Sequence, residues 1–117
     1  MTDLDRAKVL RDFASLVNMT AGEIERWLKT EKSRKVGWKG TDGSARESVG
    51  HASGRRIVKI LRRKGNDDLT TDDYAHMRKV VGYIRRHSAQ RPANVYTSRW
   101  RYSLMNWGHD PLKEDER

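Results

Sequence analysis

The chain has 117 residues, a formal net charge of +9 and no cysteine, so disulfides, thiol nucleophiles and thiolate zinc sites are excluded. No run of apolar residues reaches the roughly 20 that a membrane span needs. The first residues, MTDLDRAKVLRDF, lack an uninterrupted apolar segment and so do not form a signal peptide; we expect a cytoplasmic protein. The length predicts a single domain, placed at residues 1–112, with a frayed tail at 113–117.

Apolar residues at three- and four-residue steps predict two helices at the start of the chain, over residues 3–17 and 21–31. Thr20 and Glu23 have the spacing of a capping box. In that motif the hydroxyl accepts an N–H of the first helical turn, and the carboxylate accepts the N–H of the cap residue. So short a link between the two helices predicts a helical hairpin.

The next stretch, residues 32–53, has no helical periodicity and is rich in glycine. We expect a long, flexible, basic loop, in which residues 47–52 could begin the next helix early. The glycines match neither phosphate-binding glycine pattern, because no Gly-Lys-Ser/Thr ends the stretch and no strand precedes it.

Three further helices are predicted, over residues 53–64, from about 71 to 88 or 90, and over about 98–106. The middle one has the clearest apolar stripe, made of Tyr74, Met77, Val80, Val81 and Ile84. No stretch alternates with a period of two long enough to predict a strand. The predicted fold class is therefore all-α: a compact bundle of about five helices, with a long glycine-rich loop between the second and third.

The excess positive charge lies in two blocks. Residues 32–64 carry a net charge of +9 and residues 78–101 carry +7, and no acid occurs between Glu47 and Asp67 or between Tyr74 and Pro92. A solvated helix face usually mixes charges of both signs, because opposite charges one turn apart stabilise each other. A face of one sign indicates a polyanionic partner, which we expect to be DNA or RNA.

The candidate binding residues lie on the two cationic helices and in the loop before them. The predicted helix 53–64 contributes Arg55, Arg56, Lys59, Arg62, Arg63 and Lys64; the next helix contributes Arg78, Lys79, Arg85 and Arg86; the loop contributes Lys35, Trp38 and Lys39. Trp38 could stack on an unpaired base or fold onto the core. If the two helices pack by their apolar stripes, their basic faces would flank one groove, although the link between them is longer than a helix-turn-helix motif requires. Apart from Gln90, base-reading Asn and Gln are absent from both basic faces, so we expect phosphate contacts with weak sequence preference.

Catalysis and metal binding are not predicted. His76 and His87 would lie about 16 Å apart on one helix, too far to share a metal. No serine, histidine and aspartate stand in a recognisable nucleophile context. We therefore expect no enzymatic activity, no metal and no cofactor.

Near the end of the chain, Trp100, Leu104 and Trp107 have the spacing of core residues.

Three stretches, ESVGHASGRRIVKILRRK, LTTDDYAHMRKVVGYIRRHSAQRP and SRWRYSLMNWGHDP, resemble a family of small uncharacterised bacterial proteins. The resemblance extends over about residues 4–112 and implies no catalytic residues. Some members are labelled DNA-binding proteins, so the resemblance implies a nucleic-acid partner. The alternative is a protein-interaction or self-associating module with no nucleic-acid partner, because blocks of alternating charge can also drive docking on an acidic protein.

Overall fold

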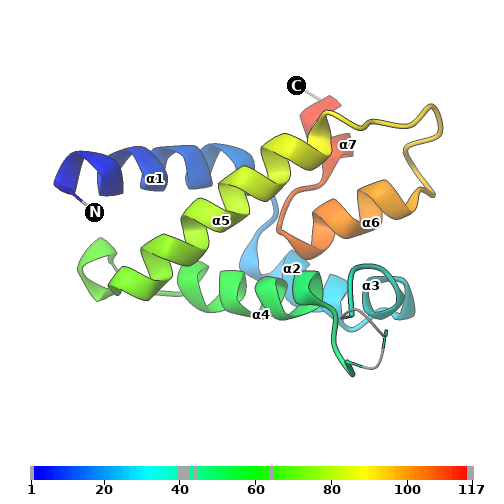
Figure 1. The fold of residues 1–117 in the computed structure, drawn as a ribbon, viewed down its shortest axis with the longest axis horizontal. Helices are drawn as coiled ribbons and strands as arrows, with labels where there is room; N and C mark the ends of the chain where they lie inside the picture. Colours follow the sequence, from blue (N-terminus) through cyan, green and yellow to red (C-terminus); the bar gives the residue numbers. More distant parts are fainter. Residues whose placement is uncertain (1, 40–42, 44, 64, 116–117) are drawn as a thin grey trace.

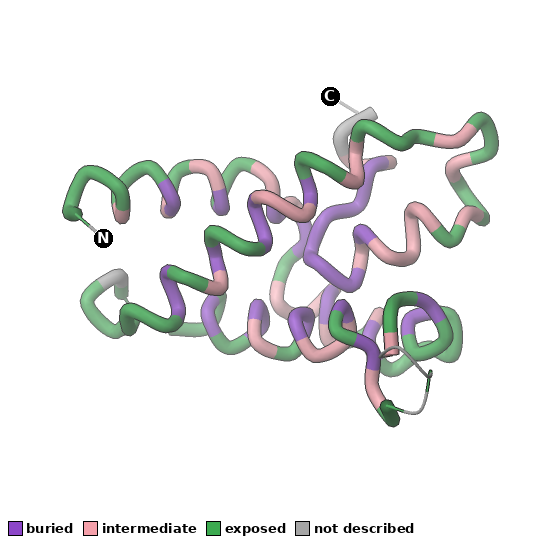
Figure 2. Tube along the Cα trace, in the orientation of Figure 1, coloured by how far each residue is buried: buried purple, intermediate pink, exposed green. Residues whose placement is uncertain are grey.

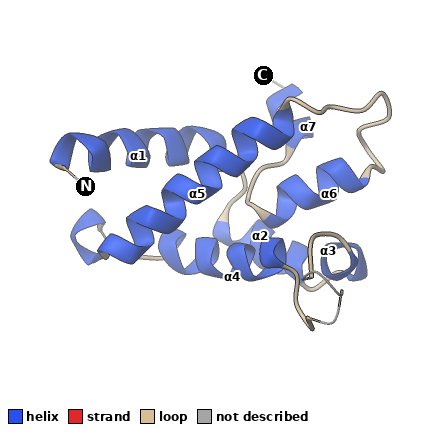
Figure 3. Ribbon diagram, viewed as in Figure 1, coloured by secondary structure: helices blue, strands red, loops and turns tan. Residues whose placement is uncertain are grey.

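A computed structural model of the chain describes residues 2–39, 43, 45–63 and 65–115. Every regular element in these residues is a helix (Figure 3), which confirms that the chain is all-α. In this part of the chain the elements are α1 (Asp3–Leu16), α2 (Ala21–Leu28), α3 (Glu31–Lys35), α4 (Val49–Leu61), the 3₁₀ helix η1 (Asn66–Asp68), α5 (Thr71–Ser88), α6 (Arg99–Asn106) and α7 (Pro111–Asp115). None of the described helices is long and apolar enough to cross a membrane.

The helices pack as two pairs joined by α6. Helix α1 lies along α5, and α2 lies along α4, while α6 contacts α2, α3, α4 and α5. Figure 1 shows α5 running diagonally from the turn after α4 toward the C-terminal end of the molecule. Four side chains from four helices are fully buried in the shared core: Ile24, Ile57, Val80 and Leu104. The predicted stripe on α5 is buried along its whole length, so periodicity located this part of the core correctly.

Helix starts follow the predicted capping chemistry. The Thr20 hydroxyl accepts a hydrogen bond from the Glu23 N–H, and the Glu23 carboxylate accepts one from the Thr20 N–H, which confirms the capping box. Thr70 and Asp73 form the same reciprocal pair at the start of α5. Each box satisfies two backbone N–H groups that the first turn of a helix leaves without an intrahelical partner.

The segment expected to be a loop at residues 32–53 is partly helical. Helix α2 ends at Leu28, and the Thr30 hydroxyl caps the separate helix α3 by accepting the Ser33 N–H. Ser48 caps α4 in the same way through the His51 N–H, so α4 begins at Val49, within the stretch 47–52 that could begin this helix early, and not at residue 53. Hydroxyl caps thus divide a stretch in which apolar periodicity gives no signal.

The C-terminal segment is tied to the link between α1 and α2. The Met19 N–H donates to the Gly108 carbonyl (3.2 Å), and the Asn18 side chain exchanges two hydrogen bonds with the backbone of Asp110. Residues 107–111 are buried (Figure 2). Pro111 starts α7, because its missing N–H and fixed φ suit the first helical position. The chain was expected to fray from residue 113, yet Lys113 forms an ion pair with Glu23.

Candidate functional site

The cations of α4 and the residues just after it were expected to lack acidic partners within the chain, and for four of them this expectation is wrong. Arg55 pairs with Glu47, Arg56 and Arg63 pair with Asp73, and Arg62 pairs with Glu25. The acids come from α2, α5 and the residue before the α4 cap, so a sequence stretch without acids is nevertheless neutralised in space. Lys59 forms no ion pair with a described residue, and Lys64 lies outside the described residues.

Asp73 is the most buried of these acids, with 4% of its surface exposed. Its carboxylate accepts from the Thr70 N–H at 2.9 Å and lies 3.3 Å from Arg56 and 3.2 Å from Arg63. Burial alone would raise the pKa of Asp73, but the hydrogen bonds of Thr70 and the charges of Arg63 and Arg56 outweigh it and lower the pKa. Asp73 therefore stays ionised and holds the C-terminal end of α4 against the start of α5.

The cations of α5 face two different sides. Arg85 lies 3.5 Å from Asp12 of α1, and Arg78 lines the same groove between α1 and α5. Lys79 and Arg86 face away from α1 and form no ion pair with any described residue. The groove expected between the basic faces of α4 and α5 is therefore replaced by a cavity beside α5, to which α4 contributes its first turn but none of its arginines.

This cavity, which we term the aromatic cavity, has a volume of about 340 Å³. It is lined by Gly37, Trp38, Val49, Gly50, Lys79, Tyr83, Arg86, Ser103 and Trp107. The rings of Tyr83 and Trp107 stack with centroids 4.2 Å apart and planes inclined by 15°. Trp38 is 61% exposed, so its ring does not fold onto the core. No acidic residue is among these lining residues, and the only charges on the wall are positive.

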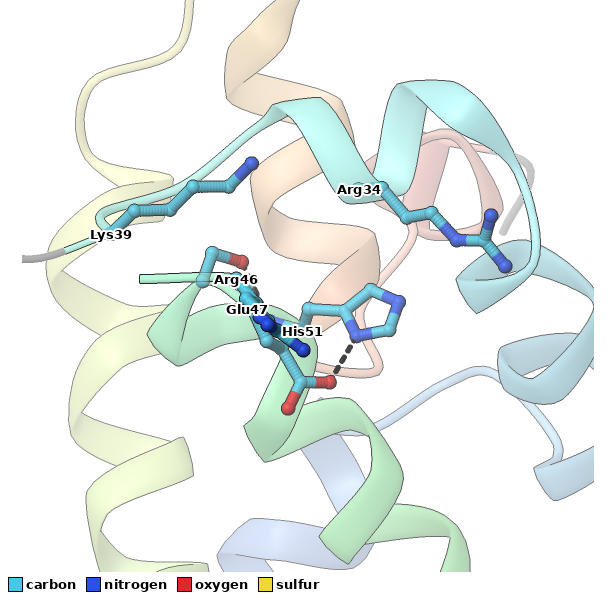
Figure 4. A pocket seen from close by; sticks show the side chains of 6 residues that line it. Arg34, Lys39, Arg46, Glu47 and His51 are labelled. Carbon is cyan, nitrogen blue, oxygen red and sulfur yellow. Dashed lines mark hydrogen bonds and ion pairs between the residues drawn. The ribbon is translucent and has the colours of Figure 1, made fainter. Parts of the chain in front are cut away.

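A second cavity, the basic cavity, has a volume of about 220 Å³ and lies at the start of α4 (Figure 4). Its lining residues are Arg34, Lys39, Arg46, Glu47, Ser48 and His51. Glu47 is already engaged: Arg55 donates to it at 2.5 and 2.8 Å and His51 lies 2.5 Å away. The Arg55 hydrogen bond is the main cause that lowers the pKa of Glu47 to about 2. The three other charged residues of this cavity have no ion pair with a described residue.

The two cavities share one segment of backbone. The Val49 N–H donates to the Trp38 carbonyl (3.0 Å), and the Ala45 N–H donates to the Lys39 carbonyl (3.1 Å). These hydrogen bonds hold Trp38 and Lys39 beside the start of α4. Trp38 lines the aromatic cavity, and Lys39 lines the basic cavity. Five cations that line the two cavities form no ion pair with a described residue, and we term this set the basic face: Arg34, Lys39, Arg46, Lys79 and Arg86.

The basic face contains some of the predicted residues and omits others. Trp38, Lys79 and Arg86 line the aromatic cavity together although Trp38 is distant from the other two in sequence, and Lys39 lines the basic cavity. Lys35 instead pairs with Glu31 at 2.7 Å on the surface of α3. Arg46 and Tyr83 were not among the candidates, and only the basic block around Arg46 carried a signal for either. Trp107 is buried as predicted, and it also forms part of the cavity wall.

Outside the two cavities, Ser53 of α4 and His76 of α5 form a further polar pair. Ser53 and His76 lie 2.9 Å apart, but Ser53 is 2% exposed, so a substrate has no access to its hydroxyl. Burial, followed by the nearby charges of Arg56 and Lys79, lowers the pKa of His76 to about 4. Among the described residues, no group of three His, Asp or Glu side chains could hold a metal ion.

No curated protein and no solved structure matches the chain. A family described as "Protein of unknown function (DUF3140)" matches residues 12–105, which include α2 to α5 and nearly all of α6. The match contains every residue of the basic face and of the aromatic cavity except Trp107. The chain therefore belongs to this family of unknown function.

Proposed function

We propose that this protein binds nucleic acid, DNA in the first instance, by placing phosphates on the basic face. The observation that carries the proposal is that three cations line the basic cavity and two line the aromatic cavity, and none of the five has an ion-pair partner among the described residues. They come from α3, from the loop on either side of the undescribed residues and from α5. Bringing like charges together raises the energy of the free protein, and phosphates relieve that repulsion.

The ion pairs of α4 move the expected surface. A phosphate bound at Arg55, Arg56, Arg62 or Arg63 has to displace a carboxylate already in place, whereas a phosphate on the basic face displaces only water and counterions. The proposal thus keeps Lys39, Lys79 and Arg86 as phosphate ligands and adds Arg34 and Arg46. The same reasoning keeps sequence preference weak, because phosphate contacts carry no base information.

The test is a charge reversal with a matched control. Lys79→Glu with Arg86→Glu removes two cations from the basic face. Arg11→Glu with Arg26→Glu makes the same change in net charge on α1 and α2, at exposed arginines that form no ion pair with a described residue. Binding of a labelled DNA is followed by fluorescence anisotropy between about 50 and 200 mM KCl, the range over which phosphate contacts lose affinity steeply.

Five phosphate contacts predict that log K falls with log salt with a slope of about −4.5 on duplex DNA, and three contacts predict about −2.7 for the Lys79/Arg86 variant. The control variant should keep the steeper slope. Equal slopes for the two variants would refute the basic face as the binding surface. A salt-sensitive oligomer that ignores DNA, measured by light scattering, would instead support the self-associating alternative.

A further inference from the structure

Two stacked rings, those of Tyr83 and Trp107, form part of the wall of the aromatic cavity. Tyr83 is fixed by stacking on Trp107 and by a hydrogen bond between its hydroxyl and that of Ser103. Trp38 supplies a third ring whose backbone is held by Val49 while 61% of the residue remains exposed. Tyr83 already stacks on Trp107 and on His87 (centroids 5.1 Å apart), so the ring of this cavity on which a further planar group can stack is the exposed Trp38.

The wall also offers an unused hydrogen-bond donor. Trp107 is only 3% exposed, and its indole N–H has no hydrogen-bond partner among the described residues. Gly50 faces this nitrogen: a Cβ at position 50 would lie 2.9 Å from Nε1. Because both residues line the cavity, the glycine leaves the N–H uncovered toward it. This nitrogen is not among the enclosed atoms without a partner, so its N–H can meet an acceptor on a ligand in the cavity that both residues line.

Positive charge lies on both sides of this ring. Lys79, Tyr83 and Arg86 stand at i, i+4 and i+7 on α5, so the two cations lie about one turn before and one turn after the tyrosine on the same helix face. A planar group stacked on Trp38 in this cavity would therefore have a cation of α5 on either side of Tyr83 within the same wall. A base in a strand is likewise preceded and followed by a phosphate, so two cations suit one nucleotide and its flanking phosphates.

We propose that the aromatic cavity accepts one unpaired base of a single-stranded nucleic acid, with the flanking phosphates on Lys79 and Arg86. This inference rests on the proposed function and narrows its ligand to the single-stranded form. The volume of about 340 Å³ is at the lower end of the range for small-molecule sites, which suits one base and not several. A base in a duplex has both faces covered by its neighbours and has to leave the stack before it can enter.

The experiment compares a labelled oligothymidylate with an oligonucleotide of the same length in which tetrahydrofuran abasic units replace the thymidines. The two carry the same phosphates, so they differ only in the bases. We expect the oligothymidylate to bind about tenfold more tightly, the size of effect that loss of one stacked base usually has. Trp38→Ala should abolish this difference while retaining binding of the abasic strand, because Trp38 supplies stacking and no charge.

The matched control is Tyr96→Ala, which removes another exposed ring, 67% exposed and outside the cavity. It should leave the tenfold preference unchanged, and circular dichroism should report native helix content for both variants. Equal affinity of the wild-type protein for the two oligonucleotides overturns the base site but leaves phosphate binding intact. Tighter binding of a duplex than of the oligothymidylate overturns it as well. Failure to bind any of the three nucleic acids at low salt overturns the proposed function itself.

Discussion

Replacing Asp73 with asparagine tests whether this carboxylate is the main link between α4 and α5. Asparagine keeps the size of the side chain, and its carbonyl oxygen can still accept the Thr70 N–H. It loses the ion pairs with Arg56 and Arg63, which lie 3.3 and 3.2 Å from the carboxylate. Removing one partner of a fully buried pair costs about 3–5 kcal/mol. Both arginines are partly exposed and regain water, so we expect a loss of about 2 kcal/mol, or roughly 8 °C in Tm for a chain of this length.

Urea denaturation at pH 7 measures this loss, with Asp72→Asn as the control. Asp72 is the exposed neighbour in the same first turn, so its replacement should cost about 0.5 kcal/mol through the helix dipole alone. Folding lowers the pKa of Asp73, so its contribution is present above the ordinary value of 3.8 and is lost as the pH falls below it. The difference between wild type and Asp73→Asn should therefore shrink at acidic pH. Equal effects of the Asp73 and Asp72 variants at pH 7 would refute the reasoning.

Two further predictions concern the core. Because burial lowers the pKa of His76 from 6.5 to about 4, the unfolded chain binds the proton more tightly, and the stability of the wild-type protein should decline as the pH falls from 6.5 to 4, by at most about 3 kcal/mol from this residue. In urea titrations at several pH values, His76→Gln should flatten this decline. An unchanged pH profile would count against a buried, neutral His76 ring. Gly54→Ala should destabilise the protein by about 2 kcal/mol in thermal unfolding, because the new Cβ would lie 2.6 Å from the Asn106 carbonyl oxygen and 2.8 Å from Leu28. The control is Gly22→Ala, where the nearest atom is the end of the Arg26 side chain at 3.4 Å; this variant should be neutral or more stable by about 0.5 kcal/mol. A smaller loss of stability at position 54 than at position 22 would contradict the close packing of α4 on α6.

The elements that sequence predicts well are those whose cause is local. The α5 stripe and the capping box at Thr20 depend on residues within one or two turns, so pattern alone locates them. Leu4 shows the limit of the same method: it fits the apolar face of α1 but is 84% exposed. Helix α3 was missed because a five-residue helix is too short to display periodicity.

The site was harder to predict because its causes are tertiary. Charge counting along the chain identified the basic blocks, but the ion pair of Arg62 depends on Glu25, which is 37 residues away. The position of Trp38 depends on the pairing of its carbonyl with the start of α4, and nothing in the local sequence decides it. The aromatic cavity likewise needs α4, α5 and α6 in place before its wall exists.

The contacts between residues 108–113 and the link after α1 have a consequence for biosynthesis. Met19 and Asn18 acquire their partners only from Gly108 and Asp110, about ninety positions later in the chain. The nascent polypeptide thus emerges from the ribosome with the link between α1 and α2 lacking these anchors until residues 108–110 have been made. Contacts of such high sequence separation form late and slow the folding of small proteins. Ribosome-stalled fragments ending before residue 108 should therefore be digested by proteases that spare a chain containing residues 108–113.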